Sequence, residues 1–301
     1  MIVMRSVSLI RVFTSLFLVV ISFGAMAAPG EKLECPPGAV FCSDFEDSSW
    51  LRALPRSVCM GNPPGSQAWF PSFFRKTHSG ERLQAEAKSG HYSLAFRNRF
   101  EKHGPAPYSF AIDPAYMQSD TMYLRWNLKY EPKYEFDSYT GVGEVKSAGI
   151  GFSDNHCGHI HAGRIPNGRD QYSANLEVTA LGYKRPKEGK PHLYVYHPGQ
   201  LGGYGDDLMQ NQGNDIIFTG GQWYEIQIML KTNKYPKCDG EVKLWINDEL
   251  RAHHTGFCFR TDNTKKINQI NLSAWFGGVA PSPRNQYQYI DDVIVSPMKI
   301  N

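Results

Sequence analysis

The feature that most constrains the fold is a strict alternation of apolar and polar residues in several short segments. In Met122–Tyr130, every second residue is large and apolar, and Tyr123, Arg125, Asn127 and Lys129 occupy the positions between. Successive side chains of a β-strand point to opposite faces, so this pattern predicts a strand with one face in a core and one polar face. Similar patterns predict strands at 40–45, 91–100, 171–179, 192–196, 223–231, 241–247, 270–276 and 287–296.

The segments between these predicted strands contain recurring proline and glycine, and few of them have a helical period. Many short alternating strands separated by turn residues are typical of a β sandwich or jelly roll. We therefore predict an all-β protein made of two antiparallel sheets packed face to face.

The N-terminus has the composition of a secretory signal peptide. Arg5 and Arg11 make the first segment positive, Val12–Phe23 is apolar, and Ala25-Met26-Ala27 is a typical small-residue cleavage site. We predict a signal peptide at 1–27 and a single domain at 28–301, secreted to the periplasm or the extracellular space; an uncleaved N-terminal anchor is the alternative. The formal net charge of +3 provides no basic field for nucleic acid. We expect a monomer that contacts neither nucleic acid nor, after signal cleavage, a membrane.

All six cysteines lie after the predicted cleavage site. An even number of cysteines in a secreted chain indicates up to three disulfides. Short separations favour Cys35–Cys42 and Cys238–Cys258 as local bridges, which leaves Cys59–Cys157 as the third. A zinc site made of cysteines is not indicated, because the chain has no CxxC pair.

The stretch His192–Gly205 carries the densest group of proton-transfer residues. Alternation places Tyr194 and Tyr196 on one face of a strand, and Pro198 and Gly199 then end it. The following loop is rich in glycine. One interpretation is a solvated aromatic edge strand, and the other is a face that binds sugar.

A series of short motifs in the second half of the chain resembles the jelly-roll polysaccharide lyases of families 14 and 20, which act on alginate and glucuronan. The motifs are Gly221-Gln-Trp223, Lys231-Thr-Asn233, Asp239-Gly240, Trp245-Ile-Asn247, Phe276-Gly-Gly278 and Tyr289-Ile-Asp-Asp292, preceded by Glu144-Val-Lys146 and Leu193-Tyr-Val-Tyr-His197. The resemblance covers residues 120–297 and implies a concanavalin A-like jelly roll.

The resemblance also implies a reaction. Lyases of this kind cleave uronate polymers by β-elimination, which needs a group that neutralises the uronate carboxylate, a base and an acid. The expected catalytic residues are Tyr196, Tyr194, His197 and Lys146. The expected substrate-binding residues are Arg125, Asn127, Lys129, His159, His161, Asn175, Gln200 and Tyr204. We further expect the polar faces of 122–130, 171–179 and 192–196 to line one concave groove, with Lys146 and Gln200 at the carboxylate. A tyrosine base would need neighbouring cations to lower its pKa.

One residue departs from the family pattern. The strand before the two tyrosines usually carries Ser-Ala-Arg, and here it reads Ser173-Ala174-Asn175. The expected cation for a uronate carboxylate is therefore replaced by a neutral amide. This difference keeps a second interpretation open, a lectin-like carbohydrate-binding protein with the same fold and no catalysis. A third interpretation is a structural envelope protein.

Other groups of polar residues allow alternative sites. His156, His159 and His161 suit a metal, a substrate or a solvent-exposed loop. Asp44, Glu46, Asp291 and Asp292 lie on the first and last predicted strands and could hold a structural calcium ion. We predict no catalytic metal and no required cofactor. The chain lacks the carboxylate spacing expected of a glycosidase and the Gly-x-Ser-x-Gly motif of a serine hydrolase.

Overall fold

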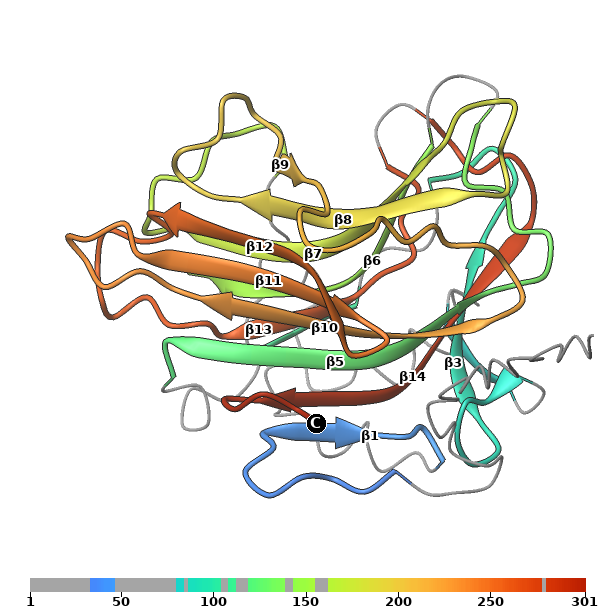
Figure 1. Ribbon diagram of the computed structural model, residues 1–301, viewed down its shortest axis with the longest axis horizontal. Coiled ribbons are helices and arrows are strands. Elements are labelled where there is room, and N and C mark those ends of the chain that lie inside the picture. The colour runs from blue at the N-terminus through green and yellow to red at the C-terminus, as the bar shows by residue number, and fades with distance from the viewer. Residues whose placement is uncertain are drawn as a thin grey trace, which may run out of the picture.

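The computed structural model describes residues 33–46, 80–83, 86–103, 108–111, 119–138, 143–154, 162–277 and 280–301. These residues form two antiparallel β-sheets and contain no α-helix, so the predicted all-β sandwich is confirmed (Figure 1). No helix within these ranges is long and apolar enough to cross a membrane. The predicted signal peptide at 1–27 lies outside the described residues.

The larger sheet has eight strands in the order β12-β11-β10-β5-β14-β3-β2, with β1 paired to β14. Its strands are β1 (Phe41–Ser43), β2 (Gly80–Leu83), β3 (Ser93–Asn98), β5 (Thr121–Tyr130), β10 (Trp223–Lys231), β11 (Gly240–Ile246), β12 (Glu249–Phe257) and β14 (Gln286–Ser296).

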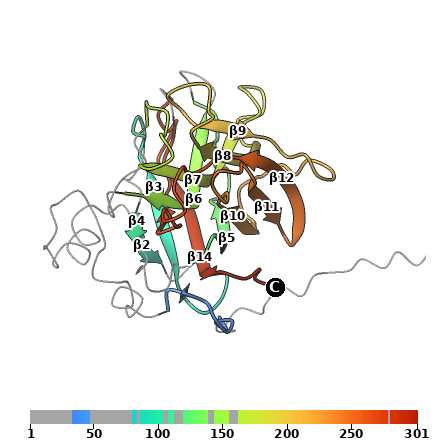
Figure 2. The ribbon, with the colours of Figure 1, turned by 90° about the vertical axis from the view of Figure 1, so that its left-hand side faces the viewer.

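The smaller sheet has six strands in the order β4-β13-β6-β7-β8-β9. Its strands are β4 (Tyr108–Ala111), β6 (Glu144–Ser153), β7 (Gln171–Ala180), β8 (Gly189–Tyr196), β9 (Asp206–Leu208) and β13 (Gln269–Leu272). Figure 2 shows the two sheets as separate layers, with β6, β7 and β8 facing β10 and β5.

The core lies between the sheets and consists of the apolar positions of the alternating strands. Trp126 and Leu128 of β5 meet Leu176 of β7 and Leu193 and Val195 of β8 in one buried cluster. Each of these side chains is fully buried. Burying one such side chain contributes on the order of 2 kcal/mol, so the alternation fixes which face of each strand turns inward. The opposite face of β7 and β8 is then left for polar residues.

A tight turn sets the register of β11 and β12. Asn247 and Asp248 both have positive φ, at 52° and 63°. Two successive residues in the left-handed region match the twist of a two-residue β-hairpin, and asparagine and aspartate tolerate this conformation better than most residues. The turn keeps Ile246 and Leu244 of β11 in the core.

Most strands predicted from alternation are found within three residues of their expected ends, but the strand expected at 270–276 ends at Leu272, and β12 was not predicted. The prediction was incomplete at 144–149, where no strand was expected and where the first part of β6 lies. Glycine at 149 and 151 weakens its alternation pattern. The strand forms because it lies in mid-sheet between β7 and β13, which pair with its backbone on both sides.

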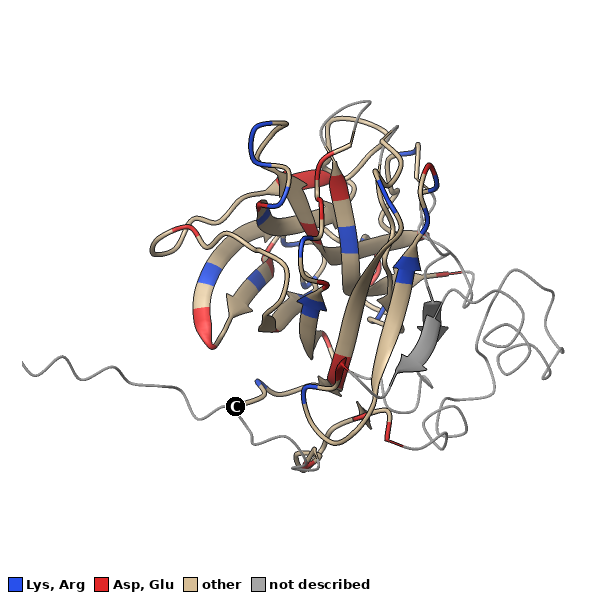
Figure 3. Cartoon of the chain, turned by 90° about the vertical axis from the view of Figure 1, so that its right-hand side faces the viewer, with Lys and Arg blue, Asp and Glu red and all other residues tan. Residues whose placement is uncertain are grey.

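Two predicted disulfides are present, Cys35–Cys42 and Cys238–Cys258. The third predicted pair, Cys59–Cys157, lies outside the described residues. Basic and acidic residues are interspersed along the strands and loops of both sheets in Figure 3, in keeping with the small net charge.

Candidate active site

The polar face of the smaller sheet brings together residues from three neighbouring strands. On β7, Ser173, Asn175 and Glu177 alternate with core residues, and on β8 the polar face carries His192, Tyr194 and Tyr196. The register pairs Ser173 with Tyr196, Asn175 with Tyr194 and Glu177 with His192. Lys146 of β6 pairs with Glu177 from the other side. Two of the three strands expected to line the site therefore do so.

The two tyrosines form a hydrogen-bonded pair. Their hydroxyl oxygens are 3.2 Å apart, and the amide of Gly205 donates to the Tyr194 hydroxyl at 2.9 Å. Burial raises the pKa of both phenols above the ordinary value of 10, and for Tyr194 the hydrogen bond to Tyr196 raises it further. Both phenols therefore carry their protons at neutral pH. The expected lowering of a tyrosine pKa is therefore not found for either residue.

Lys146 is the cation of this cluster. Its Nζ is 3.0 Å from Oε1 of Glu177 and 4.2 Å from the centre of the Tyr194 ring. Its charge lowers the pKa of Tyr196, although burial outweighs this effect. Gly277 leaves room for the ammonium group, because a Cβ at that position would lie 3.0 Å from Nζ. Lys146 thus lies where it can meet both a phenolate and an anionic ligand.

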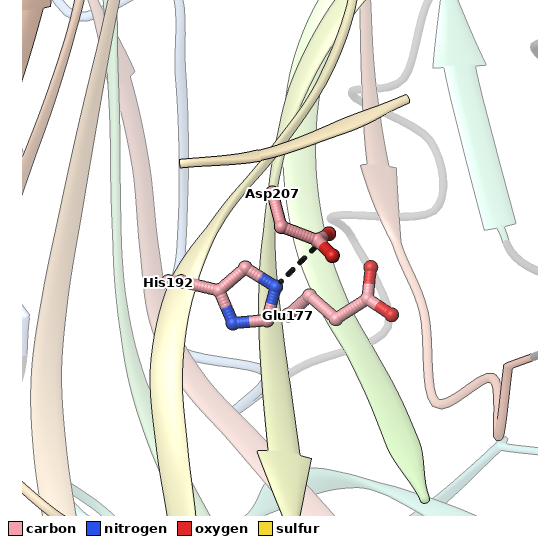
Figure 4. A group of neighbouring side chains, drawn as sticks. All are labelled: Glu177, His192 and Asp207. Carbon is pink, nitrogen blue, oxygen red and sulfur yellow. Dashed lines mark hydrogen bonds and ion pairs between the residues drawn. The ribbon is translucent and has the colours of Figure 1, made fainter. Parts of the chain in front are cut away.

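Glu177 is a buried carboxylate beside Lys146. Burial raises its pKa to about 7, against the opposing charge of Lys146, and the charge of Glu144 raises it further. His192 is also fully buried, and its Nε2 is 3.3 Å from Oδ1 of Asp207 on β9. Figure 4 shows Glu177, His192 and Asp207 on the same side of three adjacent strands.

Asn175 occupies the position where the family pattern has arginine. Its Nδ2 donates to Ser173 Oγ at 3.0 Å, and its Oδ1 accepts from Asn271 of β13 at 2.8 Å. The side chain lies over Gly149, since a Cβ there would come within 2.0 Å of Asn175 Oδ1. A row of neutral amides therefore crosses the sheet beside the tyrosines.

Two of the three predicted residues that follow β8 have structural roles. His197 lies on the other side of the strand, where it packs edge-on against Phe257 and Phe259 and donates from Nε2 to Asp206 at 2.8 Å. Gln200 accepts from the His197 amide and donates to two loop carbonyls, so its donors are not free for a uronate carboxylate. Tyr204 is exposed. The expected roles of His197 in catalysis and of Gln200 at the carboxylate are not supported by these contacts.

Arg125, Asn127 and Lys129 do not reach this site. They lie on β5, which belongs to the larger sheet, so the expected groove lined by 122–130 together with β7 and β8 is wrong. Lys129 pairs with Glu86, and Arg125 donates to the carbonyl of Asn301. The error arises because alternation identifies the polar face of a strand but not the sheet that contains it.

The remaining predictions concern metals and histidines. His156, His159 and His161 lie outside the described residues. Strand β1 does pair with β14, which brings Asp44 and Glu46 towards Asp291 and Asp292. Both oxygens of Asp292 accept hydrogen bonds, from Ser89 and Asn127, and Glu46 accepts from two backbone amides. A calcium ion at this position stays a prediction.

Glu177, His192, Asp207 and Asn271 were not predicted as site residues. Glu177 and His192 were visible as polar positions on alternating strands. Only the pairing of β6 with β7 and of β8 with β9 shows that they adjoin Lys146 and Asp207.

The raised pKa of Glu177 predicts a pH-dependent stability. Because the folded protein holds this proton more tightly than the unfolded chain, its stabilising effect is complete below about pH 4.5 and is lost as pH rises through about 7. The expected loss is on the order of 3 kcal/mol. Glu177→Gln should remove it. Urea unfolding at pH 5 and pH 8, in buffer with EDTA, measures the difference; equal pH dependence in both proteins would contradict it.

Comparisons with known proteins agree with this architecture. Residues 187–293 match the family described as polysaccharide lyase 14. No curated protein matches the chain. The solved structure of alginate lyase Aly36B is 16% identical with a TM-score of 0.56, and the match covers 70% of this chain and 84% of that chain.

Two further structures have the same fold. The marine PL-14 alginate lyase from Aplysia kurodai is 17% identical with a TM-score of 0.56, covering 72% of this chain and 87% of that one. Alginate lyase vAL-1 from Chlorella virus is 17% identical with a TM-score of 0.51, and the match covers 72% of this chain and 89% of that chain. The chain therefore has the jelly-roll fold of these lyases, and its residues 187–293 carry the sequence pattern of polysaccharide lyase family 14.

Proposed function

We propose that this protein is a secreted polysaccharide lyase that cleaves a uronate-containing polysaccharide by β-elimination. The observation that carries the proposal is the cluster of Lys146, Tyr194 and Tyr196 on the polar face of β6 and β8. A solved structure of an Aly36B variant, in which one lysine and one tyrosine are replaced by alanine, contains alginate tetrasaccharide. These are the two residue types that meet here. The two described disulfides fit an oxidising compartment.

The reaction removes the C5 proton of a uronate, forms a C4–C5 double bond and breaks the bond from C4 to the glycosidic oxygen. Lys146 would meet the carboxylate and stabilise the negative charge that develops on it. One phenol of the Tyr194–Tyr196 pair, ionised beforehand, would take the C5 proton. A phenol of the same pair would give a proton to the leaving oxygen. We assign the proton transfer to Tyr196, whose pKa the charge of Lys146 lowers.

This mechanism predicts an alkaline rise in activity. The pKa of both phenols lies above 10, so the phenolate is scarce at neutral pH. Below a pKa the ionised fraction increases about tenfold per pH unit. We expect kcat/KM to rise by about that factor per unit between roughly pH 7 and pH 9. A rate that is flat over this range would contradict a phenolate base.

A panel of polymers tests the proposed activity. The mature protein is incubated with polymannuronate, polyguluronate, glucuronan and a neutral glucan, and the ultraviolet absorbance of a 4,5-unsaturated uronate is followed. We expect absorbance to increase with at least one uronate polymer and not with the glucan. No increase with any uronate polymer would contradict the lyase assignment.

The neutral amides beside the tyrosines favour one second candidate function. Asn175 and Asn271 supply hydrogen bonds but no charge, and hydrogen bonds alone suffice to bind a sugar. A lectin-like protein would bind a polymer in affinity electrophoresis without producing unsaturated ends. The two assays together separate the candidates.

A further inference from the structure

Three side chains from neighbouring strands converge at the edge of the tyrosine cluster. Glu177 of β7, His192 of β8 and Asp207 of β9 each offer a ligand atom within 4.8 Å of the others (Figure 4). Glu177 and His192 are fully buried, whereas the side chain of Asp207 is 45% exposed. The group is therefore fixed on its inner side and open to solvent at Asp207.

The hydrogen bonds of His192 determine which ring nitrogen is available. Nδ1 is 3.4 Å from the backbone carbonyl of Lys190. A carbonyl can only accept, so Nδ1 carries a proton. In the neutral ring, Nε2 then has a lone pair, and this lone pair faces Oδ1 of Asp207 at 3.3 Å. Two lone pairs that face each other repel unless a cation lies between them, here between Nε2 of His192 and Oδ1 of Asp207.

The carboxylate of Glu177 is a third acceptor beside His192 and Asp207. Its Oε1 accepts from Lys146 at 3.0 Å. Its Oε2 is buried, and no hydrogen-bond partner for it is found among the described residues. Leaving a buried carboxylate oxygen without a partner is costly, because it has lost its water and gained no donor.

We propose that Glu177, His192 and Asp207 bind one divalent transition-metal ion of the zinc class. Zinc accepts both imidazole nitrogen and carboxylate oxygen as ligands, and a site with three protein ligands leaves a fourth position for solvent. Ligands of one zinc ion lie about 3.4 Å apart, so closing the site needs a shift of little more than about 1 Å, which the exposed Asp207 can supply.

The surrounding contacts have the form found around bound metals. The second nitrogen of a metal-binding histidine usually donates to a carbonyl, as Nδ1 does to Lys190, and the second oxygen of a ligating carboxylate usually accepts a hydrogen bond, as Oε1 does from Lys146. The positive charge of Lys146 repels a divalent cation bound beside it. The negative charges of three nearby carboxylates, those of Glu177, Asp207 and Glu144, outweigh this repulsion.

Such an ion would bind the short strand β9 to β8 and β7, and would hold Glu177 so that Lys146 stays beside the Tyr194 ring. It would also add positive charge to a face that has asparagine at position 175. The proposal goes beyond the lyase assignment, because the same three ligands would bind the ion whether or not a polysaccharide is cleaved.

Isothermal titration of the full mature protein with zinc chloride tests the site. After treatment with EDTA and dialysis, the wild type should bind one zinc ion that both Asp207→Asn and His192→Ala weaken at least tenfold. His253→Ala is the matched control. That histidine lies on β12 of the other sheet beside Glu241 and should leave binding unchanged.

Two results would overturn the proposal. A wild type that binds no zinc would show that the contact of His192 with Asp207 is an ordinary hydrogen bond and not half of a metal site. Binding that is unchanged in Asp207→Asn would show that zinc binds elsewhere, for example at the histidines of 156–161. Asp207 is exposed, so its asparagine variant decides the matter even if His192→Ala fails to fold.

Discussion

Replacing Tyr196 by phenylalanine is expected to lower kcat by a factor of about 10²–10⁴ on the best uronate polymer, which is the usual range for a general acid–base group. The ring keeps its contact with Tyr194, whose centre is 5.3 Å away, and only the hydroxyl is removed. The hydroxyl lies 3.2 Å from the hydroxyl of Tyr194 and receives a further hydrogen bond from the backbone of Gly205. We therefore expect a loss of stability of no more than about 1 kcal/mol. Initial rates of unsaturated-product formation and a urea melt measure both quantities.

The matched control is Tyr183→Phe. Tyr183 is 79% exposed, in the turn between β7 and β8, and loses the same atom without touching the cluster. It should keep full activity. If Tyr196→Phe also keeps full activity, the assignment of proton transfer to this residue is wrong. A loss in both variants would point to a general effect of the substitution on the protein.

Lys146→Met is expected to lower kcat by a factor of about 10²–10³, the scale of removing one group that stabilises developing negative charge. Methionine retains much of the aliphatic chain beside Tyr194 while the ammonium group is lost. Because the charge of Lys146 also lowers the pKa of Tyr196, the variant should need a higher pH for the activity that remains. A pH series of kcat/KM measures this displacement.

The same substitution removes the partner of Glu177. The charge of Lys146 lowers the pKa of that carboxyl, so its loss should raise the pKa further above about 7 and keep Glu177 protonated at neutral pH. Lys243→Met is the control, since Lys243 pairs with Glu241 on the larger sheet. An unchanged kcat in Lys146→Met would contradict the role of Lys146 at the carboxylate. An equal loss in Lys243→Met would show that the effect is not local.

Much of the local structure follows from the sequence. The alternation in β5 and β10 predicts their ends within a residue, and the apolar positions of β5 are those buried in the core. Cys35–Cys42 and Cys238–Cys258 join partners 7 and 20 residues apart, which made them the natural local pairs. The Tyr194–Tyr196 pair follows from two residues at alternate positions of one strand.

Which residues form the site is harder to predict from the sequence than which residues form the strands. Arg125, Asn127 and Lys129 have the polar alternation of a sugar-binding strand, yet β5 joins the larger sheet. Gln200 looks like a free amide in a glycine-rich loop, yet all its hydrogen-bonding groups are used within that loop. Polar character alone does not distinguish a residue that faces a ligand from one that supports a turn.

By itself the sequence determined which residues of each strand turn to the core, because burial of apolar surface acts on every strand in the same way. Only the tertiary structure decided which strands are neighbours. Lys146 meets Glu177 across 31 residues, and Asn271 meets Asn175 across 96. The hydrogen bonds that pair strands join backbone groups that are alike in nearly all residues. A period of two therefore specifies a face but not a partner, and the charged cluster beside the tyrosines exists only once β6, β7, β8 and β9 lie in that order.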